Sequence, residues 1–301
     1  MRLSSTWPRP AIVVAGVAAV LLLAFGWLTR PHMLSARDIP PHVPDPLNGE
    51  RLFHAGGCAS CHGAGLEGGL DLPTAFGTFR VPNISPDRGA GIGGWSDLDF
   101  INAMQSGVSP EGTHYYPAFP YSSYTRMTLP DVLDLKSYMD SFAPVSALVP
   151  GHDIAFPWSM RRGIGLWKLL YLDASFVLPV AAGQDALEQG RYLVEAVGHC
   201  GECHTPRSQL GGLLRNQWLA GAPGLDGEGR VPNITPHADG LADWSERDIV
   251  RYLKSGFTPD YDTVGGSMTQ VQENLARLPD GDRAAIAAYL KSLPPLPDPP
   301  D

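Results

Sequence analysis

Every cysteine in the chain belongs to one of two identical motifs. The 301 residues include four cysteines, which form Cys-x-x-Cys-His at positions 58–62 and again at 200–204. A turn of this spacing offers two thiols to the two vinyl groups of a haem and places the following histidine beneath the iron. The motifs therefore predict two covalently bound haem c groups. The predicted thioether positions are Cys58, Cys61, Cys200 and Cys203, and the predicted proximal iron ligands are His62 and His204.

Two other interpretations of the cysteines compete with haem attachment. A thioredoxin-like redox pair requires strand-rich sequence before the motif, whereas the flanking sequence here is helical and rich in glycine. A single zinc site built from all four thiolates is chemically reasonable, but it leaves the two following histidines unexplained. We favour haem attachment, which also agrees with export, because bacteria attach haem c outside the cytoplasm.

The N-terminal region contains an uninterrupted apolar run of 18 residues, from Ala11 to Leu28. This length is sufficient to cross a bilayer. Arg2 and Arg9 precede the run and no small-residue cleavage site is evident, so we expect an uncleaved signal anchor, with a cleaved signal peptide as the alternative. The basic tail predicts a cytoplasmic N-terminus and a single-pass inner-membrane protein whose remaining chain is periplasmic.

The overall composition limits the kind of protein further. A formal net charge of −9, without a basic stripe, argues against a nucleic-acid partner. With 34 glycines and 29 prolines, the chain is expected to have many loops and short helices rather than a large sheet. Its length fits two domains of ordinary size.

The sequence repeats itself around both cysteine motifs. The segment Val-Pro-Asn-Ile-Ser-Pro at 81–86 recurs as Val-Pro-Asn-Ile-Thr-Pro at 231–236, and Trp-Ser at 95–96 recurs at 244–245. Each repeat predicts an opening helix ending at the motif, a middle helix and a final amphipathic helix. We expect the opening and closing helices to cross at Gly49, Phe53 and Tyr138 in the first repeat, and at Gly190, Tyr192 and Tyr289 in the second. The expected caps of the middle helices are Ser96 with Asp99 and Ser245 with Asp248.

Each repeat resembles the class I cytochrome c fold, in which three or more helices surround one haem. The predicted fold class is therefore all-α, with two such domains in tandem behind an N-terminal transmembrane helix. We divide the chain into a tail and anchor (1–30), a proline-rich spacer (31–45), the first domain (46–143), an interdomain linker (144–182), the second domain (183–295) and a disordered tail (296–301).

A methionine thioether is the common second axial ligand in small electron-transfer domains of this kind. After Met160 the chain contains one further methionine, Met268, in a glycine-rich segment before the last helix. Met268 is therefore the predicted ligand of the second haem. When the repeats are aligned on their Trp-Ser pairs, Phe119 stands opposite Met268, so the first domain lacks the expected ligand.

Met127, just before the final helix of the first domain, is the candidate replacement. Two other methionines of that domain, Met104 and Met139, align with leucines of the second domain and are expected in the core. The alternatives for the first haem are His114, His54 and a five-coordinate iron whose distal face is covered by Phe119.

Polar residues that recur in both repeats are candidates for holding the haem propionates. Asparagine and tryptophan donate hydrogen bonds and arginine offsets the propionate charge. The same residue types are also common in turns and in cores. The candidates are Arg80, Asn83, Trp95, Arg230, Asn233 and Trp244.

The whole pattern resembles the multihaem cytochrome c subunits of membrane-bound bacterial dehydrogenases, such as those that partner alcohol, gluconate or aldehyde dehydrogenases. The resemblance covers roughly residues 46–295. Its most specific parts are the segments 48–53, 81–86, 116–121 and 161–170. In much of that family the residue matching Phe119 is the methionine ligand, and many relatives carry three haem motifs where this chain has two.

The segment 156–172 between the repeats mixes aromatic residues with three cations. It is predicted to be either a docking surface for a dehydrogenase or lipid headgroups, or a linker helix tucked between the domains.

We expect an electron carrier that takes electrons from a periplasmic dehydrogenase or quinol and passes them towards the respiratory chain. One alternative is a haem enzyme with an open first haem, of the peroxidase or thiosulfate-oxidising type. The other is a cytochrome subunit of a terminal oxidase.

Overall fold

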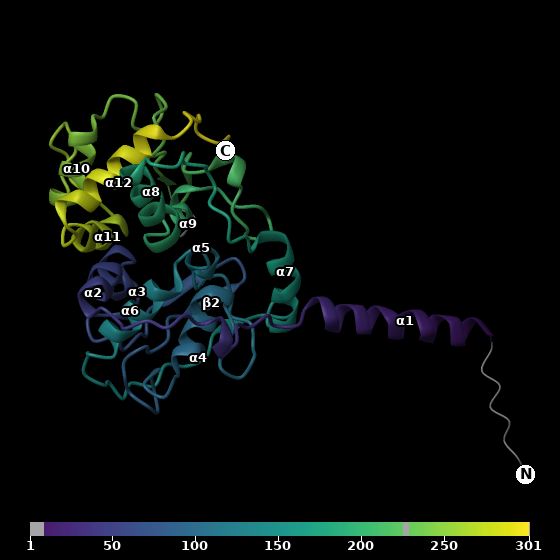
Figure 1. The fold of residues 1–301 in the computed structure, drawn as a ribbon. Coiled ribbons are helices and arrows are strands. Elements are labelled where there is room, and N and C mark those ends of the chain that lie inside the picture. The colour runs from purple at the N-terminus through teal and green to yellow at the C-terminus, as the bar shows by residue number, and fades with distance from the viewer. Residues whose placement is uncertain (1–8, 225–228, 301) are drawn as a thin grey trace, which may run out of the picture.

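The apolar N-terminal run forms most of helix α1 (Arg9–Leu28), which extends away from the rest of the molecule (Figure 1). This computed structural model describes residues 9–224 and 229–300. Arg2 and the start of the predicted cytoplasmic tail lie outside the described residues. Within the described chain, α1 is the one helix long and apolar enough to cross a membrane, as a signal sequence or an anchor would be.

The first domain contains four short α-helices and a long closing helix, with the cysteine motif in the second position. The bounds are α2 Pro46–Ala55, α3 Cys58–His62, α4 Asp97–Ile101 continued by the π-helical turn η2 Asn102–Ser106, α5 Tyr121–Tyr124, and α6 Leu129–Met139.

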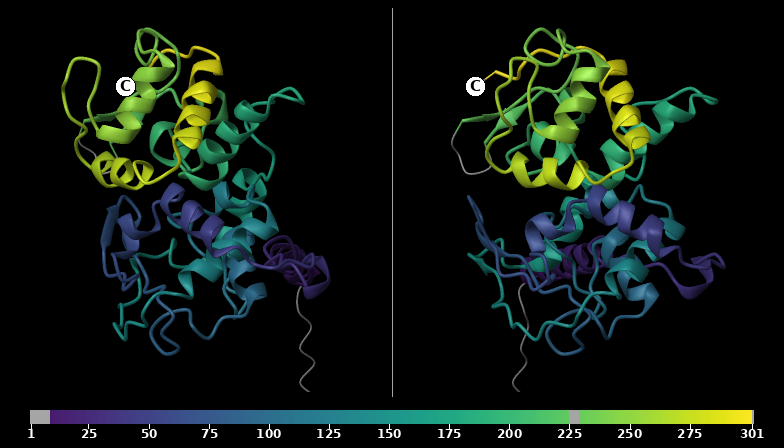
Figure 2. Two further views of the ribbon diagram at one scale, coloured as in Figure 1. Left: turned by 60° about the vertical axis from the view of Figure 1, so that its left-hand side comes forward. Right: turned by 90° about the vertical axis from the view of Figure 1, so that its left-hand side faces the viewer.

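The second domain repeats this order, and Figure 2 shows it stacked on the first. Its elements are α8 Asp185–Tyr192, the π-helical turn η4 Leu193–Val197, α9 Gly201–His204, the 3-10 turn η5 Arg215–Gln217, α10 Glu246–Ser255, α11 Met268–Leu275, and α12 Asp280–Ser292. Between the domains lie the 3-10 turn η3 Arg161–Gly163 and helix α7 Ile164–Tyr171; a further 3-10 turn, η1 Ala36–Asp38, precedes the first domain. The predicted mainly helical, two-domain fold is confirmed.

Opening and closing helices touch through their backbones in both domains. A Cβ atom on Gly49 of α2 would overlap the carbonyl of Asp134 in α6, and one on Gly190 of α8 would overlap the carbonyl of Ala285 in α12. Phe53 packs edge-on against Tyr138, with ring centroids 5.3 Å apart. Glycine is required at both crossings because no side chain fits between the helices.

The middle helix of each domain begins with the expected side-chain cap. Ser96 Oγ accepts from the backbone N–H of Asp99, and the Asp99 carboxylate accepts from the N–H of Ser96, which completes a capping box at α4. Ser245 and Asp248 form the same box at α10.

The two domains differ by one residue in the segment between the crossing glycine and the first cysteine of the motif. The segment from Gly190 to Cys200 is one residue longer than the segment from Gly49 to Cys58. The π-helical turn η4 lies within this stretch. A π-helical turn accommodates a single extra residue without displacing the residues after it. Gly190 and Cys200 can therefore keep the relation that Gly49 and Cys58 have.

Small strands supplement the helices, a feature that the composition did not predict. Strands β1 (Asp71–Thr74), β2 (Gly77–Arg80) and β3 (Asp153–Ile154) form an antiparallel sheet beside the first domain. Strands β4 (Ala222–Pro223) and β5 (Arg230–Val231) form a two-stranded ladder in the second. These strands fix the position of the loops that follow each cysteine motif.

The proline-rich spacer is attached to the first domain along its length. The side chain of Asn102, fully buried, accepts from the N–H of Leu34 at 2.7 Å. His42 Nε2 lies 2.6 Å from the carboxylate of Asp134, which also accepts from the N–H of Asp45. The spacer is therefore a docked segment of the first domain.

The C-terminal segment, expected to be disordered, is also attached. The carbonyl of Leu296 accepts from Asn233 at 2.8 Å, and the N–H of Asp298 donates to Asp239 at 3.1 Å. Asp301, the last residue of that expected tail, lies outside the described residues. The expectation was wrong for residues 296–299 because side chains of the second domain satisfy their backbone groups.

Replacing Gly190 with alanine should destabilise the second domain, because the added Cβ would overlap the α12 backbone. We expect the free energy of unfolding to fall by about 2 kcal/mol or more, measured by guanidinium chloride titration of the haem-loaded protein. Gly281→Ala in α12 is the matched control, since a Cβ there meets nothing within 4 Å. Equal losses for the two variants would contradict the steric explanation.

Candidate haem-attachment sites

The first cysteine motif forms a short helix, α3, directly after α2. Gly57, at φ 59°, makes the left-handed turn between the two helices. His62 Nδ1 lies 2.8 Å from the carbonyl of Pro82, in the repeated Val-Pro-Asn segment. This hydrogen bond places the proton on Nδ1 and leaves the Nε2 lone pair available to bind iron.

The second motif has the same arrangement. His204 Nδ1 lies 2.7 Å from the carbonyl of Pro232, the repeat counterpart of Pro82. The residue before Cys200 is His199, which adopts φ 40° where the first domain uses Gly57. Both proximal histidines are thus oriented by the main chain of the Val-Pro-Asn segment.

The chemistry of the donor set fits covalent haem in each domain. The four cysteines form no disulfides. Burial raises the pKa of Cys58 and of Cys200 to about 12, so neither is the stabilised thiolate that is typical of a redox pair. Burial also lowers the pKa of His62 to about 4, which keeps its imidazole neutral.

The four-thiolate zinc alternative does not fit the geometry. Among residues 9–224 and 229–300, no three His, Cys, Asp or Glu side chains gather as one metal site. The cysteines therefore act as two separate pairs, one in each domain.

The repeated asparagines serve the chain itself. The amide of Asn83 donates to the carbonyls of Val145 and Ala147, at 2.6 and 3.0 Å, which engages both of its hydrogens. Asn233 holds Leu296 in the equivalent way. Contact of either amide with a haem propionate stays a prediction.

The other candidates for holding propionates stay predictions. Arg80 donates to the carbonyl of Gly151 at 2.5 Å and lies 3.3 Å from Asp71, and Arg230 lies 3.6 Å from Asp298. Trp95 and Trp244 are half-buried beside the cores.

The two methionine candidates occupy different settings. Met268 is the first residue of α11 and half-buried, so the segment expected to be a loop becomes helical at this residue. Met127 is 3% exposed between α5 and α6, and its carbonyl accepts from Gln105 at 2.6 Å. Their roles as iron ligands stay predictions.

The competing histidines have other partners. His114 Nε2 lies 2.9 Å from the carbonyl of Thr29 at the end of α1, and His54 Nδ1 lies 3.3 Å from Asn274 of the second domain. Each of these contacts engages one ring nitrogen, so both histidines stay open as alternative ligands of the first haem.

Phe119 belongs to an aromatic cluster. Its ring lies 5.8 Å from those of Tyr115 and Tyr124 and 6.2 Å from that of Tyr121. Burial raises the pKa of Tyr124, and the nearby Cys58 and Cys61 raise it further, which places this phenol beside the first motif. The cluster therefore extends from Phe119 to the first haem-attachment site.

The two cysteine motifs meet across the domain interface. His199 Nε2 lies 3.1 Å from the carbonyl of Gly56, just before the first motif. Ser60, inside the first motif, accepts from the amide of Asn274 in α11 at 3.0 Å. Glu202, inside the second motif, accepts from Ser122 in α5 at 2.8 Å. Each motif thus contacts the helix that precedes the closing helix of the other domain.

Two further contacts across the interface join equivalent helices. Arg51 of α2 forms a bidentate pair with Asp282 of α12, at 2.6 and 2.9 Å. Tyr192 of α8 donates to Asp131 of α6. Tyr192 was expected to meet Tyr289 within its own domain, but its hydroxyl reaches the other domain instead. The interface therefore has approximate twofold symmetry and brings the two motifs together. The interface positions of Arg51, Tyr192, Asp131 and Asp282 were not predicted from the sequence.

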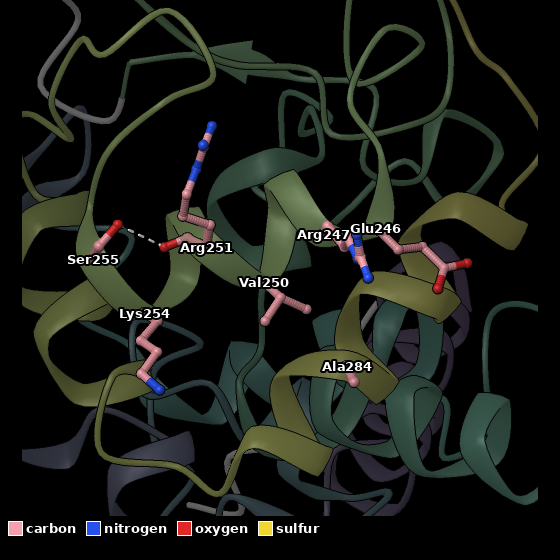
Figure 3. Close-up of a pocket in the computed structure, with 7 residues that line it drawn as sticks. All are labelled: Glu246, Arg247, Val250, Arg251, Lys254, Ser255 and Ala284. Atoms are coloured by element: carbon pink, nitrogen blue, oxygen red, sulfur yellow. Dashed lines mark hydrogen bonds between the residues drawn. The ribbon is translucent and has the colours of Figure 1, made fainter.

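A surface pocket on α10 and α12 lies apart from these sites (Figure 3). Two of its charged residues pair with neighbours: Arg251 lies 3.3 Å from Asp248, and Lys254 lies 3.2 Å from Asp280. None of the residues lining it belongs to a cysteine motif.

Each motif falls within a separate match to a known protein family. A family model described as "Cytochrome c" matches residues 47–143 and again residues 187–294. The chain belongs to the cytochrome c family. Both haem-attachment sites of this cytochrome therefore lie in domains of that family.

One relative of this cytochrome is described as dihaem, and others are cytochrome subunits of dehydrogenases. The "Diheme cytochrome c-type" protein of Cereibacter sphaeroides is 47% identical over 98% of this chain and 100% of its own length. The fructose dehydrogenase cytochrome subunit of Gluconobacter japonicus is 36% identical over 95% of this chain, and the gluconate 2-dehydrogenase cytochrome c subunit of Pantoea cypripedii is 38% identical over 81%. The chain spans 60% and 58% of the length of those two subunits. It is a dihaem electron carrier similar to the cytochrome subunits of dehydrogenases.

Arg51→Met should weaken the domain interface by about 2–4 kcal/mol, because it leaves Asp282, which is 8% exposed, without its cation. Calorimetry of the haem-loaded cytochrome is then expected to resolve separate unfolding of the two domains. Arg251→Met is the control, since its pair with Asp248 is more exposed and should contribute less than about 1 kcal/mol. A variant that unfolds like the parent would show that the pair does not hold the domains together.

Met268→Ala should remove the thioether-to-iron absorption band of the second haem, and Met127→Ala that of the first, because each would remove one sulfur ligand. Absorption spectra of the oxidised cytochrome measure both bands. Met139→Ala is the control, as Met139 is buried to the same 3% exposure as Met127. A Met127→Ala spectrum identical to the control would reject Met127 as a ligand.

Proposed function

We propose that this cytochrome takes electrons from a periplasmic dehydrogenase or quinol and passes them towards the respiratory chain while α1 holds it in the inner membrane. The observation that carries the proposal is the contact between the residues that precede the two haem-attachment motifs, His199 and Gly56. Haem iron supplies one-electron chemistry by alternating between its ferric and ferrous states.

The residues of the chain have to keep the two sites close and at a fixed separation. The hydrogen bond of His199 with Gly56 joins the segments that precede the two motifs, and that of Asn274 with Ser60 joins the first motif to α11 of the second domain. The pair of Arg51 with Asp282 joins α2, which precedes the first motif, to the closing helix α12 of the second domain. A rigid, short separation favours electron transfer between domains, because the rate of such transfer falls steeply with distance.

Retention of α1 is supported by how its last turn is packed. Thr29 is fully buried, and its hydroxyl accepts from Arg162 Nε at 2.9 Å. Its carbonyl lies 2.9 Å from His114 Nε2. Removing the helix at this point would leave Arg162 and a buried histidine without these partners, at a cost in stability.

A haem enzyme is the second candidate function, and Phe119 is the observation that favours it. An apolar ring in place of a methionine opens a coordination position at which a small molecule could bind. Against this, Phe119 is packed among three tyrosines, which leaves little freedom for it to move aside.

Carbon monoxide binding by the reduced cytochrome distinguishes the two functions. If both irons have two protein ligands, carbon monoxide should leave the Soret spectrum unchanged over minutes. Rapid binding of one equivalent would instead overturn the simple carrier for the first domain and support an open haem. The Met127→Ala variant is the positive control, because loss of its sulfur should create a binding site.

A further inference from the structure

Helix α7 has an apolar face that is exposed. Leu166, Leu169 and Leu170 are 40%, 61% and 68% exposed. Residues three and four apart share one side of a helix, so the three leucines form a single stripe. We call this stripe the α7 leucine face.

The opposite side of α7 is fastened to both domains. Lys168 Nζ donates to the carbonyls of Ser106 and Gly107 in the first domain, at 2.6 and 2.8 Å. Trp167 Nε1 donates to the carbonyl of Leu210 in the second domain at 2.9 Å. Helix α7 is therefore bound to both domains, and its leucine face has a fixed direction relative to them.

The end of α1 is fixed to the start of α7. Gly165 packs directly on Thr29, where a Cβ would come within 2.6 Å of the Thr29 backbone. Arg162 Nη2 donates to the carbonyl of Gly26 at 2.6 Å. In Figure 1, α7 runs crosswise to α1, with both domains on one side of it and α1 leaving on the other. The leucine face thus lies on the side from which α1 extends.

We propose that α7 lies in the surface of the bilayer that α1 crosses, with its leucine face inserted among the lipids. This proposal rests on the proposed retention of α1. The junction has the residues of a membrane interface, since the Arg30 guanidinium lies 5.5 Å from the ring of Trp27, which is 63% exposed. Together with Arg162 it supplies positive charge for anionic headgroups beside an apolar helix face.

Photo-crosslinking in proteoliposomes tests the proposal with the full chain. Leu169 is replaced by the photoreactive amino acid p-benzoylphenylalanine, and the haem-loaded protein is placed in vesicles of phosphatidylethanolamine and phosphatidylglycerol. Leu22, in α1, and Leu148, an 85% exposed leucine outside α7, receive the same replacement for comparison. After irradiation, mass spectrometry measures the lipid adduct, and the Soret absorbance verifies that each variant is folded.

We expect several-fold more lipid adduct at positions 22 and 169 than at 148. Adduct at 22 without adduct at 169 would overturn the membrane role of α7 and leave the anchor intact. No adduct at 22 would overturn the anchor and the α7 proposal with it. A crosslink from position 169 to a second copy of the chain, in place of lipid, would assign the leucine face to self-association and overturn the proposal.

Discussion

The direct backbone contact between the opening and closing helix sets the geometry of each domain. Gly49 and Gly190 permit this contact because any side chain there would overlap a carbonyl of the closing helix. Since each cysteine motif follows shortly after its opening helix, the crossing determines where the thiols and the proximal histidine lie. The same opening helices carry Arg51 and Tyr192 to the other domain, so the crossing also directs the two motifs towards each other.

The sequence predicted the interior of each domain much better than the contact between domains. The motifs, the crossing glycines and the caps at Ser96 and Ser245 depend on local chemistry or on a pattern that occurs twice. The interface lacks such a pattern, because Arg51 pairs with a carboxylate through a salt bridge while its counterpart Tyr192 uses a hydroxyl. A difference in charge between equivalent positions of the two repeats, close to a cysteine motif, is therefore the sequence signal that points to a domain interface.

The composition of the proline-rich segments did not predict that they are bound to the haem domains. Proline removes a backbone donor and interrupts regular helices and strands, which led us to expect a spacer before the first domain and a disordered tail after the second. The backbone groups of these segments are instead satisfied by side-chain amides, as Asn102 does for Leu34 and Asn233 does for Leu296. A hydrogen bond between one amide and a distant irregular segment leaves no periodic trace in a sequence. The asparagines of the Val-Pro-Asn repeats were noticed for their recurrence, and that recurrence reflects this tethering.

The burial of Thr29 has a consequence for how the molecule searches for its redox partners. A haem domain on a flexible tether samples many heights and orientations above a membrane, and a partner can meet any of its faces. Here the last turn of α1 and the following segment are built into the first domain, so the domains turn only as α1 turns. Under the proposed retention of α1 in a membrane, their encounters would become a search in two dimensions with one orientation presented. A partner whose site lies at another height above the membrane would not make contact.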